Sequence, residues 1–484
     1  MNGQESSRPL SLKSLAVYAL MLAATAGLFL VIRHFGLGLQ APAGQGAALP
    51  SQVGGAASHG ALFHLLLALA AVIAAGRSLG VLFKYLHQPP VIGEVLAGIL
   101  LGPSLLGRIA PEAAAFLLPA SVAPMLSMLA HVGVILYMFI VGLELDTATL
   151  GQRGHSTIAI SHASIVVPFL LGAALALGIY PVMSSSDVPF TVFALFLGVA
   201  MSVTAFPVLA RILTDRRMSR THLGIIALAC AAVDDATAWC LLALVVGIAQ
   251  AAVGGALLSV ALTIAYIGLM VAVVRPLLMR TLPRIETEGL SQGVVALVFL
   301  GVLLSALTTE SIGVHAIFGA FMLGAIIPHD SLIAREFGHK LSDLVSVLLL
   351  PAFFAFTGMR TQIGLVSGAE QWLLCGLIIL VATAGKFGGT LAAARFTGLG
   401  WRDSAALGIM MNTRGLMGLI VLNVGLDLGV ISPTLFAMMV IMALATTLAT
   451  APVLVWLRVG GHCDNAHDGG LPVSKIERAN TSPT

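Results

Sequence analysis

The sequence predicts an all-α polytopic membrane protein with about 13–14 transmembrane helices, and three observations lead to this fold class. Hydrophobic residues make up 58% of the 484 residues and charged residues only 9%, whereas soluble domains carry about 25% charged residues. The mean hydropathy of the chain is +1.02. The apolar residues come in runs of about 17–25, the length that crosses a bilayer as a helix. We therefore expect lipid to be the solvent for most of the chain.

Charged or Gly/Pro-rich segments separate these runs and set the expected ends of each helix. The first run is interpreted as an uncleaved helix instead of a signal peptide, because no clear small-residue cleavage site follows it directly. The ninth and tenth runs are divided only by the region of Glu310. The expected helices cover residues 15–32, 61–84, 91–107, 121–145, 157–180, 189–213, 221–249, 254–280, 292–309, 312–328, 342–359, 371–395, 404–427 and 433–457.

This pattern divides the chain into three parts. Residues 1–60 comprise an extra N-terminal helix and a nearly uncharged Ala/Gly/Pro-rich linker, which we expect outside the cell. Residues 61–458 form the transmembrane domain. Residues 459–484 are polar and predict a short cytoplasmic tail.

The distribution of basic residues predicts the orientation. With both termini in the cytoplasm, most Lys and Arg residues fall on the cytoplasmic side, and only Arg33, Arg108 and Arg360 are placed outside. We therefore expect a multi-pass protein of a cell membrane, namely a bacterial inner membrane. The net charge of +3 gives no reason to expect a nucleic-acid partner.

Few ionisable residues lie deep in the predicted membrane, and the main ones are Asp234, Asp235, Lys386 and Arg414. Each costs about 2.5–3.5 kcal/mol at a helix centre, so each needs a partner or a role. Adjacent residues point about 100° apart on a helix, so the two aspartates face different neighbours. One can pair with a fixed cation while the other binds a mobile ion. Because burial disfavours a charged carboxylate, such a group can alternate between a proton and a metal cation.

Lys386 lies near the middle of the twelfth expected helix, in the sequence Gly-Lys-Phe-Gly-Gly. An unpaired lysine at that depth would lose its proton or extend to the interface. The surrounding glycines permit close approach of another helix. The simplest expectation is a buried ion pair between Lys386 and an aspartate, which can be structural or can open and close during transport.

Two of the expected helices carry signals of an interruption. Pro207 removes a backbone donor in the sixth, next to the hydroxyls of Ser202 and Thr204. Residues 412–415, which include Arg414 and Gly415, form a polar break in the thirteenth. Interrupted helices in corresponding halves indicate a transport site near the bilayer midplane. The two breaks are seven helices apart, so these helices run in opposite directions. We therefore expect inverted repeats made of helices two to seven and nine to fourteen.

These features favour a secondary transporter over an enzyme. An intramembrane aspartyl protease needs two carboxylates that face each other across one site, which neighbours on one helix cannot easily do. Two alternatives remain. One is a gated potassium-efflux channel, although no Thr-Val-Gly-Tyr-Gly filter signature is present. The other is a non-transporting sensor with the same fold.

The chain resembles the second branch of the monovalent cation:proton antiporter superfamily, and it is most similar to cation/proton exchangers of plant, fungal and bacterial type. The matching stretches run in order over about residues 75 to 458. They are QPPVIGEVLAGILLGP at 88–103, FIVGLELD at 139–146, SVTAFPVLARIL at 202–213, the aspartate motif, GVHAIFGAF at 313–321, GKFGGT at 385–390 and NTRGL at 412–416.

The resemblance implies a homodimer with a dimerisation domain, and a core domain in which two discontinuous helices cross and move by an elevator-like mechanism. It implies that Asp235 binds the metal cation and the proton, that Asp234 pairs with Lys386, and that Thr204 sits at the crossing. The implied substrates are protons and either sodium or potassium, with no cofactor, and the implied role is pH homeostasis. Two aspartates with a lysine resemble sodium-using members, whereas the flanking motifs resemble potassium-associated members.

Overall fold

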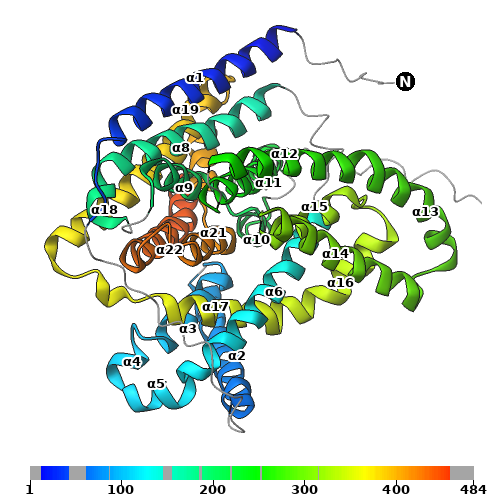
Figure 1. Ribbon diagram of the computed structural model, residues 1–484, viewed down its shortest axis with the longest axis horizontal. Coiled ribbons are helices and arrows are strands. Elements are labelled where there is room, and N and C mark those ends of the chain that lie inside the picture. Colours follow the sequence, from blue (N-terminus) through cyan, green and yellow to red (C-terminus); the bar gives the residue numbers. More distant parts are fainter. Residues whose placement is uncertain are drawn as a thin grey trace, which may run out of the picture.

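The computed structural model describes residues 12–42, 61–86, 88–144, 155–184, 188–218, 221–250, 253–313 and 315–457, and within these ranges every regular element is a helix (Figure 1). Most of the expected external linker, the expected cytoplasmic tail and Asp146 of the FIVGLELD stretch lie outside the described residues. Apolar side chains cover the outside of many helices, as expected of a chain solvated by lipid.

The helices follow one another along the chain with short connections. They are α1 (Leu12–Gly36), α2 (Ala61–Tyr85), α3 (Pro90–Leu101), α4 (Leu106–Ile109), α5 (Pro111–Leu117), α6 (Ala123–Glu144), α8 (His155–Met183), α9 (Phe190–Ser202), α10 (Phe206–Asp215), α11 (His222–Gln250), α12 (Val253–Leu269), α13 (Arg275–Glu288), α14 (Gln292–Ile312), α15 (Ala316–Ile326), α16 (Leu332–Leu344), α17 (Leu350–Arg360), α18 (Gly368–Thr383), α19 (Gly389–Phe396), α20 (Trp401–Met411), α21 (Leu416–Asp427) and α22 (Pro433–Trp456). Single π-helical turns join α12 to α13, α16 to α17, and α18 to α19 into continuous helices.

The number of membrane spans agrees with the prediction. Within the described residues, 12 helices are long and apolar enough to cross a membrane, and the bent pair α20–α21 makes up to 13. The tenth expected span, residues 312–328, is the exception. Gly313 ends α14 with a φ of 88°, and α15 covers only 11 residues, about 16 Å of helix. The run contains one helix that is shorter than the bilayer core and packs against α6 and α14.

Several helix ends also differ from the predicted ends. The eleventh span begins at Leu332, well before residue 342, because Ser331 caps the helix by accepting a hydrogen bond from the amide of Ala334. The eighth continues to Glu288 instead of ending at 280. Glu310 does not separate two spans but lies in the last turn of α14, where its carboxylate accepts from the amide of Ala316 at 2.8 Å.

The helices pack in two groups, and the site lies inside one of them. In one group α6 contacts α15, α16 and α17, and α3 contacts α2 and α17. In the other, α8 contacts α9, α11 and α19, while α20 and α21 pack on α22 (Figure 1). Helix α9 is buried along most of its length, because its neighbours cover it on all sides. This burial places the end of α9 in the interior of the protein.

Candidate functional site

Two interrupted helices meet in the middle of the protein. The backbone is extended between Ser202, where α9 ends, and Phe206, where α10 begins. The second break, residues 412–415, separates α20 from α21, which are bent by 43°. The amide of Ala205 donates to the carbonyl of Thr413 at 3.0 Å, so the two breaks touch through their backbones. This contact defines what we call the crossing, residues 203–205 and 412–415.

The last four carbonyls of α9 have no backbone partner within the helix, yet each accepts a hydrogen bond from a side chain. Arg414 donates from Nη1 to the carbonyl of Ala200 at 2.9 Å and from Nη2 to that of Met201 at 2.7 Å. Lys386 donates from Nζ to the carbonyl of Ser202. The hydroxyl of Ser202 donates to the carbonyl of Val199 at 2.9 Å. Two cationic side chains therefore stabilise the negative end of this half-helix.

Asp234 lies on α11 and is fully buried, and its carboxylate accepts four hydrogen bonds. Oδ2 accepts from Lys386 Nζ at 2.8 Å, from the hydroxyl of Ser164 at 2.6 Å and from that of Thr204 at 2.8 Å. Oδ1 accepts from the hydroxyl of Ser161 at 2.8 Å. A carboxylate with this many donors is held in one position, because each donor fixes its direction.

Lys386 lies on the π-helical turn between α18 and α19, and its side chain is fully buried. Such turns occur frequently at functional sites, because the extra residue changes the direction of a side chain. Close packing against α8 brings Nζ to the carbonyl of Ser164 at 2.9 Å. Gly385 permits this packing, because a Cβ at that position would lie 2.8 Å from the Cα of Pro168. All three hydrogens of the ammonium group therefore have acceptors.

Asp235, the next residue on α11, has a different environment from Asp234. Its Oδ2 accepts from the amide of Phe206 at 3.3 Å, at the positive N-terminal end of α10. Its Oδ1 is buried and has no hydrogen-bond partner among the described residues. The side-chain oxygen of Asn412, at the second break, is also buried without a partner in that part of the chain. Buried oxygens of this kind are ligands for a cation that has lost water.

The remaining predicted residues also lie at the crossing. Pro207 occupies the first turn of α10, where its missing amide costs no hydrogen bond. Gly415 begins α21, and a Cβ there would lie 2.5 Å from Cγ2 of Val208 on α10. Thr204 donates to the carbonyl of Met411 at 3.2 Å as well as to Asp234. The roles assigned to these residues in ion binding stay predictions.

Sequence reasoning missed several residues that the structure brings to the crossing. Ser161 and Ser164 on α8 hold Asp234, and Thr447 on α22 accepts from the amide of Arg414 at 2.9 Å. The partnerless oxygen of Asn412 was not singled out either. The only sequence signal was the presence of two serines three residues apart in an apolar run, which places them on one face of a helix.

Comparison with known proteins gives one family. A sequence profile described as sodium/hydrogen exchanger, transmembrane, matches residues 65–457. The Na(+)/H(+) antiporter NhaS4 of Synechocystis sp. is 45% identical over 397 residues, which cover 81% of this chain and 97% of that protein. Cation/H(+) antiporter 20 of Arabidopsis thaliana is 39% identical over 405 residues, 81% of this chain and 48% of that protein.

K(+)/H(+) antiporter 1 of Saccharomyces cerevisiae is 33% identical over 382 residues, 77% of this chain and 44% of that protein. The chain thus spans about half the length of these plant and yeast relatives. Among solved structures, the fold is similar to that of the sodium proton antiporter MjNhaP1 from Methanocaldococcus jannaschii. The TM-score is 0.60 at 16% identity, and the match covers 82% of this chain and 97% of that one.

Proposed function

The chain belongs to the sodium/hydrogen exchanger family, as its motifs predicted, and we propose that it exchanges sodium or potassium for protons across a membrane by alternating access. The observation that carries the proposal is the pair of adjacent buried aspartates at the crossing. One of them accepts four hydrogen bonds, and the other has a buried oxygen that no donor among the described residues reaches. A fixed charge beside a carboxylate oxygen of this kind is what competition between a proton and a cation requires.

In this proposal Asp235 binds the proton and the metal cation in turn. Its Oδ1 is the first ligand of the cation, and bound cation and bound proton exclude each other because one carboxylate serves both. Asp234 and Lys386 form the coupling pair, which supplies a balanced charge beside the ion. Thr204 and Ser202 shape the site: the first holds Asp234, and the carbonyl of the second holds Lys386. Arg414, Pro207 and Gly415 maintain the two breaks.

The wider setting of the protein is part of the same proposal. We place both termini in the cytoplasm of a bacterial cell, because this orientation puts most basic residues on the cytoplasmic side. The protein would act as a homodimer in the inner membrane and contribute to pH homeostasis. The names of the relatives, which mention sodium, potassium or a cation in general, support a monovalent cation as substrate.

The proposal is tested by proton flux in proteoliposomes with an imposed pH gradient. Sodium, potassium and lithium are added in turn to wild type and to Asp235→Asn. We expect a cation-triggered proton flux in wild type, and the ion that triggers it identifies the substrate. We expect no flux above background in Asp235→Asn, because an amide cannot carry the exchanged proton or the negative charge.

Cys240, which lies on the same helix as Asp235, provides a matched control. The substitution Cys240→Ala on α11 should leave the flux unchanged, because it removes no group of the crossing. Full flux in a folded Asp235→Asn protein would remove Asp235 from the site. No flux with any cation from folded wild-type protein would contradict antiport and favour a gated channel or a sensor.

A further inference from the structure

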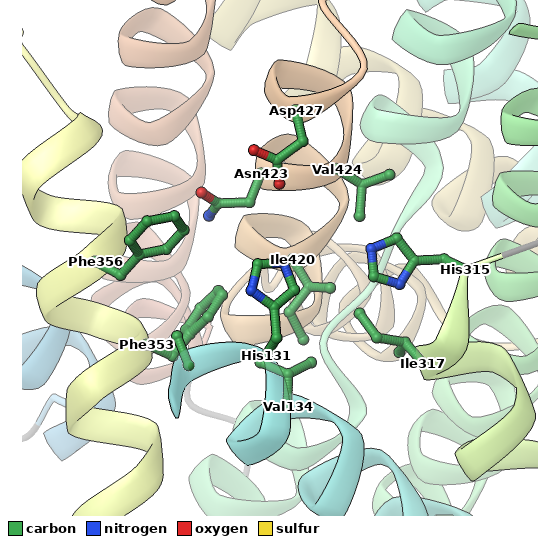
Figure 2. A pocket seen from close by; sticks show the side chains of 11 residues that line it. His131, Val134, His315, Ile317, Phe353, Phe356, Ile420, Asn423, Val424 and Asp427 are labelled. Atoms are coloured by element: carbon green, nitrogen blue, oxygen red, sulfur yellow. The ribbon is translucent and has the colours of Figure 1, made fainter. Parts of the chain in front are cut away.

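A second group of ionisable side chains surrounds a small cavity at the end of α21 that is remote from the crossing. The cavity lies between α6, α15, α17 and α21, and Figure 2 shows that His131, His315, Asn423 and Asp427 surround it. Its volume is about 20 Å³, which is room for about one water molecule. Apolar side chains such as Phe353 and Phe356 form the rest of its wall. Nothing in the proposed exchange at Asp235 uses these groups.

The tautomer of His131 follows from its hydrogen bond. Nδ1 lies 2.7 Å from the carbonyl oxygen of Ser127, one turn earlier on α6. A carbonyl only accepts, so Nδ1 carries a hydrogen and donates it. In the neutral ring Nε2 therefore holds the lone pair and is the atom that can take up a proton.

His315 is positioned to share that proton. It immediately precedes α15, and its ring lies parallel to that of His131, with 7° between the planes and 6.2 Å between the centroids. Its Nδ1 is buried and has no hydrogen-bond partner among the described residues. Figure 2 shows both rings directed toward the same space below Asp427. One water molecule in this space can connect the two rings.

The charges around the pair favour one proton over two. Burial disfavours an imidazolium at His315, and the carboxylates of Glu310 on α14 and Asp427 on α21 offset part of that effect. Arg360 on α17 offsets part of that field, because its Nη2 binds Asp427 Oδ1 at 2.6 Å. A second proton would place two positive rings at a centroid separation of 6.2 Å, where they repel. In the described part of the chain, these are the charged groups that face the two histidines from the packed helices.

Both helix groups meet at this cavity, and two helices lead from it toward the crossing. α21 begins at Leu416, next to Gly415 of the second break, and ends at Asp427 beside the cavity. α6 carries His131, and about 9 Å further along the same helix it carries Tyr137, which lies within electrostatic range of Asp235. Both α6 and α21 therefore extend from the cavity to the neighbourhood of the exchange site.

We propose that His131 and His315 form a second proton-binding site, which holds one proton in transit between the external water and Asp235. This inference rests on the proposed function and on the proposed orientation. A proton from water binds the lone pair of one imidazole nitrogen and converts the neutral ring to an imidazolium. The ring then returns to neutral as it gives the proton to a cavity water. Only N–H and O–H bonds form and break, and the histidines act as a proton relay.

The test compares exchange at different external pH values with the internal pH fixed. The variant is the double substitution His131→Asn and His315→Gln. Asn at 131 keeps a donor for the Ser127 carbonyl, and neither amide titrates. We expect the maximal rate near neutral external pH to fall about tenfold or more, as for loss of a positioned acid–base group, with an unchanged KM for the cation. The wild-type rate should show a step as the external pH passes through the range in which the two histidines titrate, and the variant should lose this step.

The matched control is His64→Gln, which removes a histidine of α2 whose Nδ1 is likewise buried without a partner in the described chain. It should keep the wild-type profile. A double variant with the wild-type rate and pH profile would overturn the relay. Loss of the same step in His64→Gln would overturn it as well. These results differ from a failure of the proposed function itself, in which wild type shows no cation-dependent flux at any pH.

A second variant and a second readout keep the test independent of folding of the double variant. Asp427→Asn keeps both rings and removes the nearby anion, so the step should move to lower pH. Infrared difference spectra of purified protein between pH 5 and 8, about the range in which histidine titrates, should show an imidazole band. That band should move with Asp427→Asn and remain in place in His64→Gln. An unmoved step and an unmoved band would each contradict the proposal.

Discussion

The crossing and the cavity at the end of α21 each contain an ion pair, and the two pairs differ in burial more than in distance. Lys386 and Asp234 are 2.8 Å apart, and both side chains are 0% exposed. Arg360 and Asp427 are closer, at 2.6 Å, but their side chains are 13% and 38% exposed. Water screens the second pair and can replace either partner. The comparison indicates that the burial of an ion pair, and not the distance between its charged atoms, decides how much the stability of the protein depends on that pair.

The surroundings of Asp234 and Asp427 also differ. Asp234 accepts from Ser161, Ser164, Thr204 and Lys386, all of them buried. Among the described residues, Asp427 has one ion-pair partner, Arg360, which comes from a helix of the other packed group. The first arrangement holds a charge in one place. The second joins two groups of helices through a contact that can open at small cost.

The largest expected effect is that of Lys386→Ala. Removing one partner of a buried pair leaves Asp234 charged and uncompensated, so the free energy of unfolding should fall by about 3–5 kcal/mol. The measurement is the unfolding transition of the purified protein in detergent. A free energy of unfolding equal to that of wild type would show that Asp234 does not depend on the pair.

The double substitution Lys386→Met and Asp234→Asn is the matched control for this prediction. It removes both charges and keeps similar side-chain volumes, so it should be less destabilising than Lys386→Ala alone. A double variant that is as unstable as the single one would mean that the lost hydrogen bonds to the carbonyls of Ser164 and Ser202, and not an unpaired buried charge, explain the effect.

An intermediate effect is expected for Arg414→Ala. The change removes the donors to the carbonyls of Ala200 and Met201 at the end of α9, and two buried acceptors then lack partners. The free energy of unfolding should fall by about 2 kcal/mol, less than for Lys386→Ala, because the orphaned groups are neutral. Arg414→Lys should recover only part of the loss, because an ammonium group cannot reproduce the two parallel hydrogen bonds of the guanidinium group. Equal stability of Arg414→Ala and wild type would argue that water satisfies these carbonyls.

The smallest effect is expected at the more exposed pair. Arg360→Ala should lower the free energy of unfolding by about 1 kcal/mol or less, because water screens Asp427 once its partner is gone. The same unfolding measurement applies. A decrease in the free energy of unfolding as large as that of Lys386→Ala would contradict the difference proposed between the two regions. It would mean that the contact between the two helix groups contributes much of the stability.

The fold was largely predictable, because hydropathy is a local property that needs no knowledge of contacts. Thirteen of the expected runs coincide with full spans or with a broken span in the described residues. The run 312–328 contains only the 11-residue helix α15, which is shorter than the length that crosses a bilayer by itself. Its apolar composition is the same for a helix that crosses lipid and for a short helix buried in protein, so composition alone could not distinguish them.

The site was only partly predictable. Asp234, Asp235 and Lys386 stand out because charges are rare in apolar helices, and Pro207 and Gly415 stand out as helix breakers. Ser161, Ser164 and Thr447 do not stand out. Hydroxyl side chains inside helices commonly donate to the carbonyl four residues earlier, as Thr237 and Thr390 do here. The sequence cannot say which hydroxyl instead reaches a buried charge on another helix.

The sequence by itself determined that this is a membrane protein with two interrupted helices and a few buried charges, because each of these properties resides in a short stretch of the chain. The tertiary structure decided how those stretches meet. It assigned Lys386 to Asp234, left an oxygen of Asp235 without a partner, and brought His131 and His315 from separate helices to one cavity. Such pairings depend on helix packing between residues far apart in sequence, and no local pattern encodes them.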